Sequence, residues 1–311
     1  MPTVFFRIDT SFRPHGCWPV KRRSWDEITS SGVKIAIILP GGRRMLPDFE
    51  MIQHSFLGGH DITVVPISDV HLGSAECMEQ EFMQFLETVR NTPDLYLTLG
   101  GDLIDNGTRS SVTNVFRATM YPSEQKRVMA KLLEPVRDRI LCFVPGNHER
   151  RSGKDADDDP VYDIAAKLDL EHLYRENIAF LKIQLGVQEY ESGLKTAAFL
   201  RPTYCLVLVH GSGGGILTGG AVNRGERFGY VIDGMDALIV GHTHKPFTTQ
   251  PGKILIDPRN NLVTVKPFKV ICATSWLRFG GYAAQKMLTP STHCLQTLTL
   301  RGKKKEIIVT M

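Results

Sequence analysis

Side chains of the types that bind metal ions follow five apolar runs of the sequence. The five segments are SDVH, GGDLIDNG, GNHE, VHG and GHTH. They supply seven candidate ligands, which are Asp69, His71, Asp102, Asn147, His210, His242 and His244. In DxH and HxH, alternate residues of an extended segment share a face, so both side chains of each pair can point the same way.

These residue types select the chemistry. Oxygen and imidazole ligands without thiolate suit Mn²⁺, Fe, Zn²⁺ or Mg²⁺, and seven ligands exceed the four that a tetrahedral ion needs. We therefore expect two divalent ions that share a carboxylate, with Mn²⁺ as the first choice. Paired ions about 3.5–4 Å apart stabilise the attacking and leaving oxygens of an in-line displacement at phosphorus.

The ligands can meet only if the elements before them end at one edge of a sheet. Apolar, β-branched runs predict strands at 62–68, 95–101, 140–146, 177–185, 203–209, 237–241, 269–274, 295–300 and 306–310. The pattern predicts helices at 76–91, at 123–133 with Ser123 as N-cap, and from Pro160 to 174. Strand–helix alternation followed by strands indicates an α/β core with antiparallel additions. Ligands bind in such a core at the carboxyl ends of the parallel strands.

Regular alternation begins only near residue 61. We therefore expect an N-terminal extension over 1–60, largely irregular, and a catalytic domain over 61–311. Within the extension, 33–42 is strand-like, and the segments 18–23 and 41–44 are basic.

Two loops near the motifs invite functional interpretations. The glycine-rich segment 211–220 lacks the GxxxxGK[ST] pattern of a phosphate-binding loop, so we expect a flexible loop near the site. The acidic segment 155–159 either borders the entrance to the site or caps the next helix.

Composition excludes several classes of protein. The 311 residues are 42% hydrophobic and carry a net charge of +4, which suits an anionic substrate but not a protein that coats nucleic acid. The six cysteines are scattered without a CxxC, as in a reducing compartment. No apolar run is long enough for a membrane span, and no secretory signal is visible, so we expect a cytoplasmic protein without a membrane partner.

Together and in this order, DVH, GDLIDNG, GNHE, HG and GHTH resemble the motifs of the calcineurin-like metallophosphoesterase superfamily, over about residues 61–275. The resemblance implies a four-layer α/β/β/α sandwich with a dinuclear metal site at the carboxyl ends of strands. It implies one ion on Asp69, His71 and His244, and a second ion on Asn147, His210 and His242. Asp102 would bridge the two ions, and a bridging hydroxide would be the nucleophile.

The same resemblance assigns roles beside the metals. His148 matches the position that assists the leaving group as general acid, and Asp105 matches the carboxylate that orients this histidine. Alternatively, His148 is structural and Asp105 caps the following turn. Among the other histidines, His54, His60, His172 and His293 match no motif.

The superfamily includes nucleases, nucleotide phosphodiesterases, protein phosphatases and lipid pyrophosphatases, so the fold leaves the substrate open. Protein Ser/Thr phosphatases carry an arginine in the second motif, where this chain has Asn106, and their last motif lacks the paired histidines of GHTH. Arg151, however, falls where those phosphatases have a second phosphate-binding arginine, and Arg150 precedes it. We expect Arg150, Arg151 and Asn106 to contact substrate.

The pattern as a whole is more similar to the phosphodiesterase and repair-nuclease branches. We therefore predict a phosphodiesterase or nuclease that hydrolyses a phosphodiester bond in a nucleotide or nucleic acid. The alternative within enzymes is a phosphomonoesterase, including a protein phosphatase. A non-catalytic scaffold that retains the fold, or a nucleic-acid-binding module, is an alternative of another class. A homo-oligomer is left open.

Overall fold

The computed structural model describes residues 47–311, apart from 109–110, 112–114, 187–201 and 215. Contacts divide the chain into two units, Met1–Met45 and Leu46–Met311, and every element below belongs to the second unit. The strand-like run at 33–42, the two basic segments and Cys17 lie outside the described residues.

One mixed sheet of the second unit has five strands in the order β13-β12-β2-β3-β4. They are β2 (Ile62–Ile67), β3 (Leu95–Leu99), β4 (Ile140–Phe143), β12 (Thr297–Leu300) and β13 (Ile307–Thr310). β2, β3 and β4 run parallel, and the tail strands β12 and β13 add to β2 as an antiparallel hairpin. The five-stranded sheet therefore combines the predicted α/β core with its antiparallel addition.

The other large sheet has six strands in the order β1-β5-β6-β7-β11-β8. They are β1 (Ile52–Phe56), β5 (Ala179–Leu185), β6 (Thr203–Leu208), β7 (Ala237–Val240), β8 (Phe247–Thr249) and β11 (Lys269–Cys272). β6, β7 and β11 are parallel to one another, whereas β5 and β8 run antiparallel to their neighbours β6 and β11.

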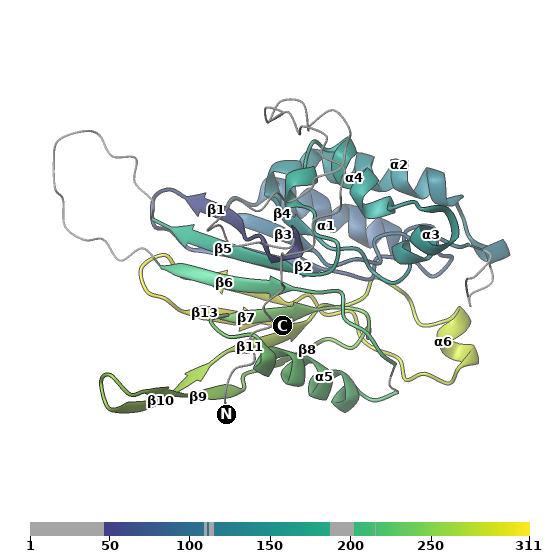
Figure 1. Cartoon of the computed structure of the whole chain (residues 1–311). Helices are drawn as coiled ribbons and strands as arrows, with labels where there is room; N and C mark the ends of the chain where they lie inside the picture. The colour runs from purple at the N-terminus through teal and green to yellow at the C-terminus, as the bar shows by residue number, and fades with distance from the viewer. Residues whose placement is uncertain (1–46, 109–110, 112–114, 187–201, 215) are drawn as a thin grey trace, which may run out of the picture. The chain divides into compact units, whose positions relative to one another are not determined.

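Helices cover the outer faces of the two sheets, as Figure 1 shows. The helices are α1 (Glu79–Asn91), α2 (Pro122–Leu133), α3 (Glu149–Ala156), α4 (Pro160–Lys167), α5 (Thr218–Val231) and α6 (Gly281–Gln285). Short 3₁₀ helices occur at Pro47–Phe49, Val115–Arg117, Glu134–Arg139 and Glu171–Leu173. α1, α2 and α4 lie over the five-stranded sheet, and α5 packs against β7, β8 and β11. This arrangement confirms the predicted four-layer α/β/β/α sandwich.

The space between the sheets is filled by strand side chains. β2 and β4 are buried almost throughout, as expected of strands covered on both faces. β12 instead alternates buried leucines with half-buried threonines. Parallel strands thus end at one edge, and their last residues are held firmly by the core.

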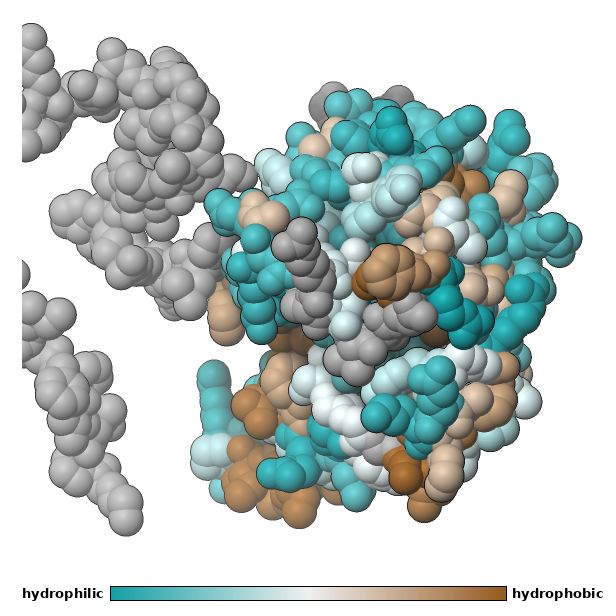
Figure 2. Space-filling view, turned by 90° about the vertical axis from the view of Figure 1, so that its right-hand side faces the viewer, coloured by the Kyte–Doolittle hydropathy of each residue, from teal (hydrophilic) through white to brown (hydrophobic). Residues whose placement is uncertain are grey.

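A two-stranded hairpin, β9 (Gly252–Asp257) with β10 (Leu262–Pro267), stands apart from both sheets. Its cross-strand pairs Ile254–Val265 and Ile256–Val263 are exposed. Figure 2 shows the side of the unit that lies on the right in Figure 1, with apolar side chains gathered toward the bottom, at the height of α5.

The structure corrects several sequence expectations. β1 lies within 1–60 and pairs with β5, so this part of the expected extension is a strand of the second unit. The N-cap of α2 is Tyr121 rather than Ser123, because Pro122 occupies the first helical position. α4 ends at Lys167 instead of reaching residue 174.

The structure also describes most of the glycine-rich segment 211–220 and all of the acidic segment 155–159. The end of the glycine-rich segment is the first turn of α5, not loop. In the acidic segment, Asp159 caps α4 by accepting the Tyr162 N–H, and Asp158 pairs with Lys126. Among the described residues, no helix has the length and apolar character needed to cross a bilayer.

Candidate metal centre

The seven predicted ligands lie on the loops that follow β2, β3, β4, β6 and β7. Five of them have left-handed backbone, with φ between 51° and 69°, namely Asp69, His71, Asp102, His242 and His244. Residues other than glycine rarely adopt this backbone conformation, and residues strained in this way cluster at functional sites. Backbone hydrogen bonds hold the first two loops together, since Asp69 N–H donates to the Gly101 carbonyl and His71 N–H to the Asp102 carbonyl.

Asp69, His71 and His244 form one group of donors. His244 Nε2 lies 3.1 Å from Asp69 Oδ1 and 3.4 Å from His71 Nε2. Asp69 Oδ2 accepts the His242 backbone N–H at 2.9 Å, whereas Asp69 Oδ1 is buried without a hydrogen-bond partner. A buried, unsatisfied carboxylate oxygen facing two imidazoles is what a cation would satisfy.

A second group contains Asn147, His210 and His242. Asn147 Oδ1 lies 3.0 Å from His210 Nε2 and 2.6 Å from His242 Nδ1. The other ring nitrogen of His210 donates to the Gly100 carbonyl at 2.7 Å, which turns Nε2 toward Asn147. Such an outer hydrogen bond fixes the tautomer of a metal-binding histidine.

Asp102 lies between the two groups. Its Oδ2 is 3.4 Å from His210 Nε2 and 3.8 Å from His71 Nε2. Its Oδ1 accepts the His148 backbone N–H at 2.8 Å, so only Oδ2 faces the histidines of both groups. Gly146 makes this approach possible, because a Cβ there would lie 2.1 Å from Asp102 Oδ1.

The donor set fits divalent cations. Two ligands of one such ion lie about 3 Å apart, because each bond is about 2.1 Å long, and most separations within each group are close to this value. Three sets of donors could each hold an ion, and two of them are Asp69–His71–His244 and Asp102–His210–His242. Oxygen and imidazole donors without thiolate suit Mn²⁺, Fe, Zn²⁺ or Mg²⁺.

The protonation states of these side chains also suit the binding of cations. Burial opposes the charges of Asp69 and Asp102, yet His244 beside the one and His210 beside the other keep both carboxyl pKa values below their usual range. Burial lowers the pKa of His71 to about 3, which leaves a neutral imidazole. Burial would also lower the pKa of His210, but Asp102 raises it to about 10. A metal ion would displace this proton.

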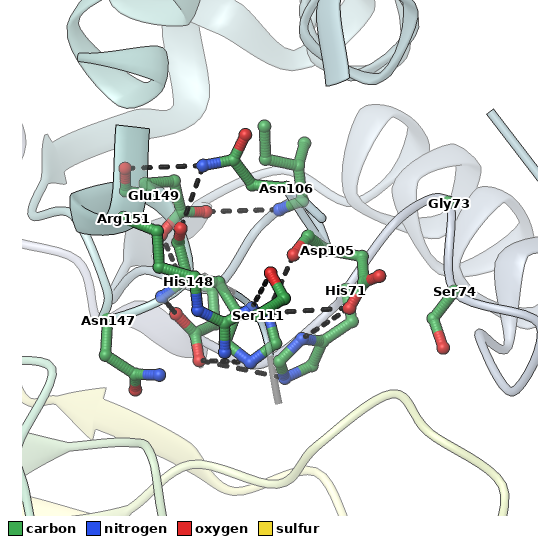
Figure 3. A network of polar contacts seen from close by, with 12 residues as sticks. His71, Gly73, Ser74, Asp105, Asn106, Ser111, Asn147, His148, Glu149 and Arg151 are labelled. Atoms are coloured by element: carbon green, nitrogen blue, oxygen red, sulfur yellow. Dashed lines mark hydrogen bonds and ion pairs between the residues drawn. The ribbon is translucent and has the colours of Figure 1, made fainter. Parts of the chain in front are cut away.

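His148 stands beside the donor groups, and Figure 3 shows its network. Its Nδ1 lies 2.8 Å from the Asp105 backbone carbonyl and 3.4 Å from the Asp105 carboxylate. Its Nε2 faces Asp102 Oδ2 at 3.9 Å. Burial lowers the pKa of His148, but Asp105 and Asp102 together outweigh this effect, so that the net pKa is raised. Asp105 thus contacts His148 as expected, with its carbonyl closer than its carboxylate.

Asn106, which was expected to contact substrate, has its side chain inside the protein. Asn106 is fully buried, and its amide donates to the His148 carbonyl and exchanges hydrogen bonds with Ser152. It therefore lies behind the GNHE turn and supports it. Figure 3 shows Asn106 on the side of the network away from Asn147.

Glu149 was not singled out by the sequence, although it belongs to GNHE. It is buried, and its carboxylate accepts the backbone N–H groups of Asp102, Ile104 and Gly146 at 2.8–3.1 Å. The loops after β3 and β4 are therefore joined through one side chain. Its place in GNHE was the sequence signal that could have identified it.

The two arginines of GNHERR point to different places. Arg151 donates to Ser111 and lines a cavity of about 460 Å³ together with His71, Asp105 and His148. Arg150 donates to the Asn177 side chain and lines a second cavity, of about 610 Å³, together with His210. Asn147 and Thr243 line both cavities, so the two cavities adjoin there. Most of the donors line the smaller cavity, namely His71, Asp102, Asn147, His242 and His244.

The other histidines of the described residues lie apart from the two donor groups. His54 bonds to the Leu141 carbonyl, His60 to Asp94 and His293 to the Ser275 carbonyl. No metal-type cluster among the described residues includes any of them or His172.

Several known proteins are similar to this chain. Solved structures that resemble the chain include a metallophosphoesterase from Sphaerobacter thermophilus (14% identity, TM-score 0.37, 80% of this chain and 89% of that one). Another is the calcineurin-like phosphoesterase YfkN from Bacillus subtilis (11%, 0.34, 78% and 85%). A third is Haemophilus influenzae NAD nucleotidase (9%, 0.39, 81% and 49%). No curated protein matches the sequence. The sequence model of the calcineurin-like phosphoesterases matches residues 62–246, more than half of the chain, which therefore belongs to this family.

Proposed function

We propose that this phosphoesterase hydrolyses a phosphodiester bond in a nucleotide or nucleic acid, with two divalent ions, by preference Mn²⁺. Asp69, His71 and His244 would hold one ion, Asn147, His210 and His242 would hold the other, and Asp102 Oδ2 would contact both. Bound ions would neutralise charge on the phosphoryl oxygens and supply an activated water.

His148 would act on the leaving group. Its Nδ1 is turned to Asp105, so Nε2 is the nitrogen that can give a proton to a departing oxygen. Its raised pKa keeps the imidazolium form available near neutral pH. Asp105 would therefore serve as a positioning residue.

The observation that carries the diester proposal is the pair of cavities that adjoin at the donor residue Asn147. A phosphodiester has two substituents that need room, whereas a phosphomonoester has one. Each cavity is of a size that suits a small organic group.

One observation favours a phosphomonoesterase instead. Arg151 lines the cavity that contains His148, where it could bind a dianion. The second arginine of such a clamp is missing, because Asn106 occupies its position and is buried. A singly charged diester needs the weaker clamp.

The test compares hydrolysis of bis-p-nitrophenyl phosphate and p-nitrophenyl phosphate with added Mn²⁺. We expect a higher kcat/KM for the diester, and a loss of at least about 100-fold in Asp102→Asn, since even outer-shell changes cost 10–100-fold. Asp169→Asn is the matched control, because Asp169 also has left-handed backbone but lies outside the site. Preference for the monoester would select the phosphatase alternative. Inactivity on both esters, with two ions bound, would favour a scaffold.

A further inference from the structure

The larger cavity contains features that hydrolysis of a simple diester does not require. It has a volume of about 610 Å³ and begins at Asn147 and His210. One side is formed by α5, and another by Arg150 of α3 together with Asn177. This volume lies within the range of small-molecule sites.

Three arginines line this cavity, namely Arg150, Arg224 and Arg227. An arginine side chain stays protonated at any ordinary pH. In the described part of the chain, none of the three forms an ion pair with a carboxylate. Three positive charges therefore lie around one space without a neutralising partner.

The hydrogen bonds of these arginines are to neutral groups. Arg150 donates to the Asn177 side chain and the Glu176 carbonyl. Arg224 donates to the carbonyls of Gly213 and Gly214, and its Nε is buried without an acceptor. Hydrogen bonds to neutral oxygens orient a guanidinium and leave its charge in place. The guanidinium groups of Arg150 and Arg224 are thus held in place and can each bind an anion.

Five apolar side chains also line the cavity. Val209, Ala221, Phe228, Val231 and Val240 contribute to the cavity, and Phe228 and Val231 are exposed. An aromatic ring beside arginines suits a nucleobase, which stacks on its face, whereas the guanidinium groups suit phosphate oxygens.

We propose that this cavity binds a second phosphate of the substrate, so that the enzyme prefers a nucleotide diester carrying a further phosphate group. The inference rests on the proposed function and narrows its substrate class. The scissile phosphate belongs at the metal ligands, and the arginines lie on the side of Asn147 and His210 away from His148. They would therefore contact a phosphate displaced from the one that reacts.

The experiment uses a matched pair of chromogenic substrates, thymidine 3′-(p-nitrophenyl phosphate) with and without a 5′-phosphate. We expect the 5′-phosphorylated ester to have a KM about tenfold lower in the wild-type protein. The ratio of the two KM values should fall toward one in Arg227→Gln and in Arg150→Gln. Arg90→Gln, an exposed arginine of α1 outside both cavities, is the control and should retain the wild-type ratio.

A binding measurement needs no turnover. Calorimetry with the Mn²⁺-loaded protein should give a Kd about tenfold lower for thymidine 3′,5′-bisphosphate than for thymidine 3′-monophosphate, with the difference lost in Arg150→Gln/Arg227→Gln. A thymidine trinucleotide carries the second phosphate within a strand. Tighter binding of the bisphosphate than of the trinucleotide would identify a mononucleotide as the source of the second phosphate, and tighter binding of the trinucleotide would identify a strand.

Equal Kd values in the wild-type protein, or a preference that survives in the double variant, would overturn the proposal. Its failure is distinct from failure of the proposed function. Hydrolysis of bis-p-nitrophenyl phosphate, without a preference for the 5′-phosphorylated ester, would refute only the second-phosphate site. Arginine-dependent binding of the bisphosphate, without hydrolysis of any ester, would refute only the catalytic proposal.

Discussion

Aspartate and histidine at the centre are held in backbone conformations that cost free energy. Left-handed backbone costs on the order of 1 kcal/mol or more at each non-glycine residue, and five of the seven ligand positions adopt it. The compensation comes from close contacts between loops, such as that of Gly146 with Asp102.

Gly146→Ala tests these contacts. The added Cβ would overlap Asp102 Oδ1, so we expect a destabilisation of about 1–3 kcal/mol and weaker binding of Mn²⁺. Gly219→Ala is the control, because a Cβ at Gly219 of α5 meets no atom within 4 Å and should be neutral or stabilising. Thermal unfolding and Mn²⁺ titration of both variants measure the effects. Wild-type stability in Gly146→Ala would contradict the close approach.

His148→Ala separates a proton donor from a structural histidine. A p-nitrophenolate leaves without a proton, so bis-p-nitrophenyl phosphate should be hydrolysed with only a small loss. A diester with an alkyl leaving group requires the proton and should lose about 10²–10⁴-fold in kcat. An equal loss with both leaving groups would show that His148 only supports the fold of the loop.

Glu149, at the start of α3, connects this helix to the loops of the site. Its two carboxylate oxygens accept three backbone N–H groups from the loops after β3 and β4. In Glu149→Gln, one oxygen is replaced by an NH₂ group, so at least one buried N–H would lose its acceptor. We expect a loss of about 1–3 kcal/mol in the free energy of unfolding, measured by urea denaturation. The exposed control Glu171→Gln should change it by less than about 0.5 kcal/mol, and an equal change in both variants would refute the role of Glu149.

The strands before the motifs were predictable because they are continuous apolar runs. α5 was not, because its sequence TGGAVNRGERFGYV contains four glycines that disfavour a helix. Packing explains two of them, since a Cβ at Gly229 would lie 2.4 Å from Phe268 and one at Gly225 would lie 2.8 Å from Val270. Tertiary contacts thus override the local preference. β1 escaped notice as a short strand with polar His54 and Ser55.

At the scale of the whole unit, the centre joins the two sheets. Asp69, Asp102 and Asn147 follow strands of the five-stranded sheet, whereas His210 and His242 follow strands of the other sheet. The His242 N–H bond to Asp69 and the His210 bond to Gly100 both cross between the sheets. The order of motifs predicts that these residues share an edge. It does not reveal which atoms meet, nor that Asn106 is buried while Arg150 and Arg151 line different cavities.

Removal of metal should therefore weaken the whole unit. A ligand at 100 times its Kd stabilises a protein by about 2.7 kcal/mol, which corresponds to an increase in Tm of roughly 5–10 °C for a domain of this size. We expect this increase when Mn²⁺ is added to chelator-treated protein, and a smaller one in Asp102→Asn. A Tm that is independent of Mn²⁺ would contradict a cation shared by the two sheets.

We expect two ions to bind within bridging distance on either side of Asp102. Electron paramagnetic resonance of the protein with two equivalents of Mn²⁺ measures whether they do. Ions about 3.5–4 Å apart should give an exchange-coupled spectrum, and Asp102→Asn should convert it to the six-line spectrum of isolated Mn²⁺. An isolated six-line spectrum in the wild-type protein at full loading would contradict the dinuclear site.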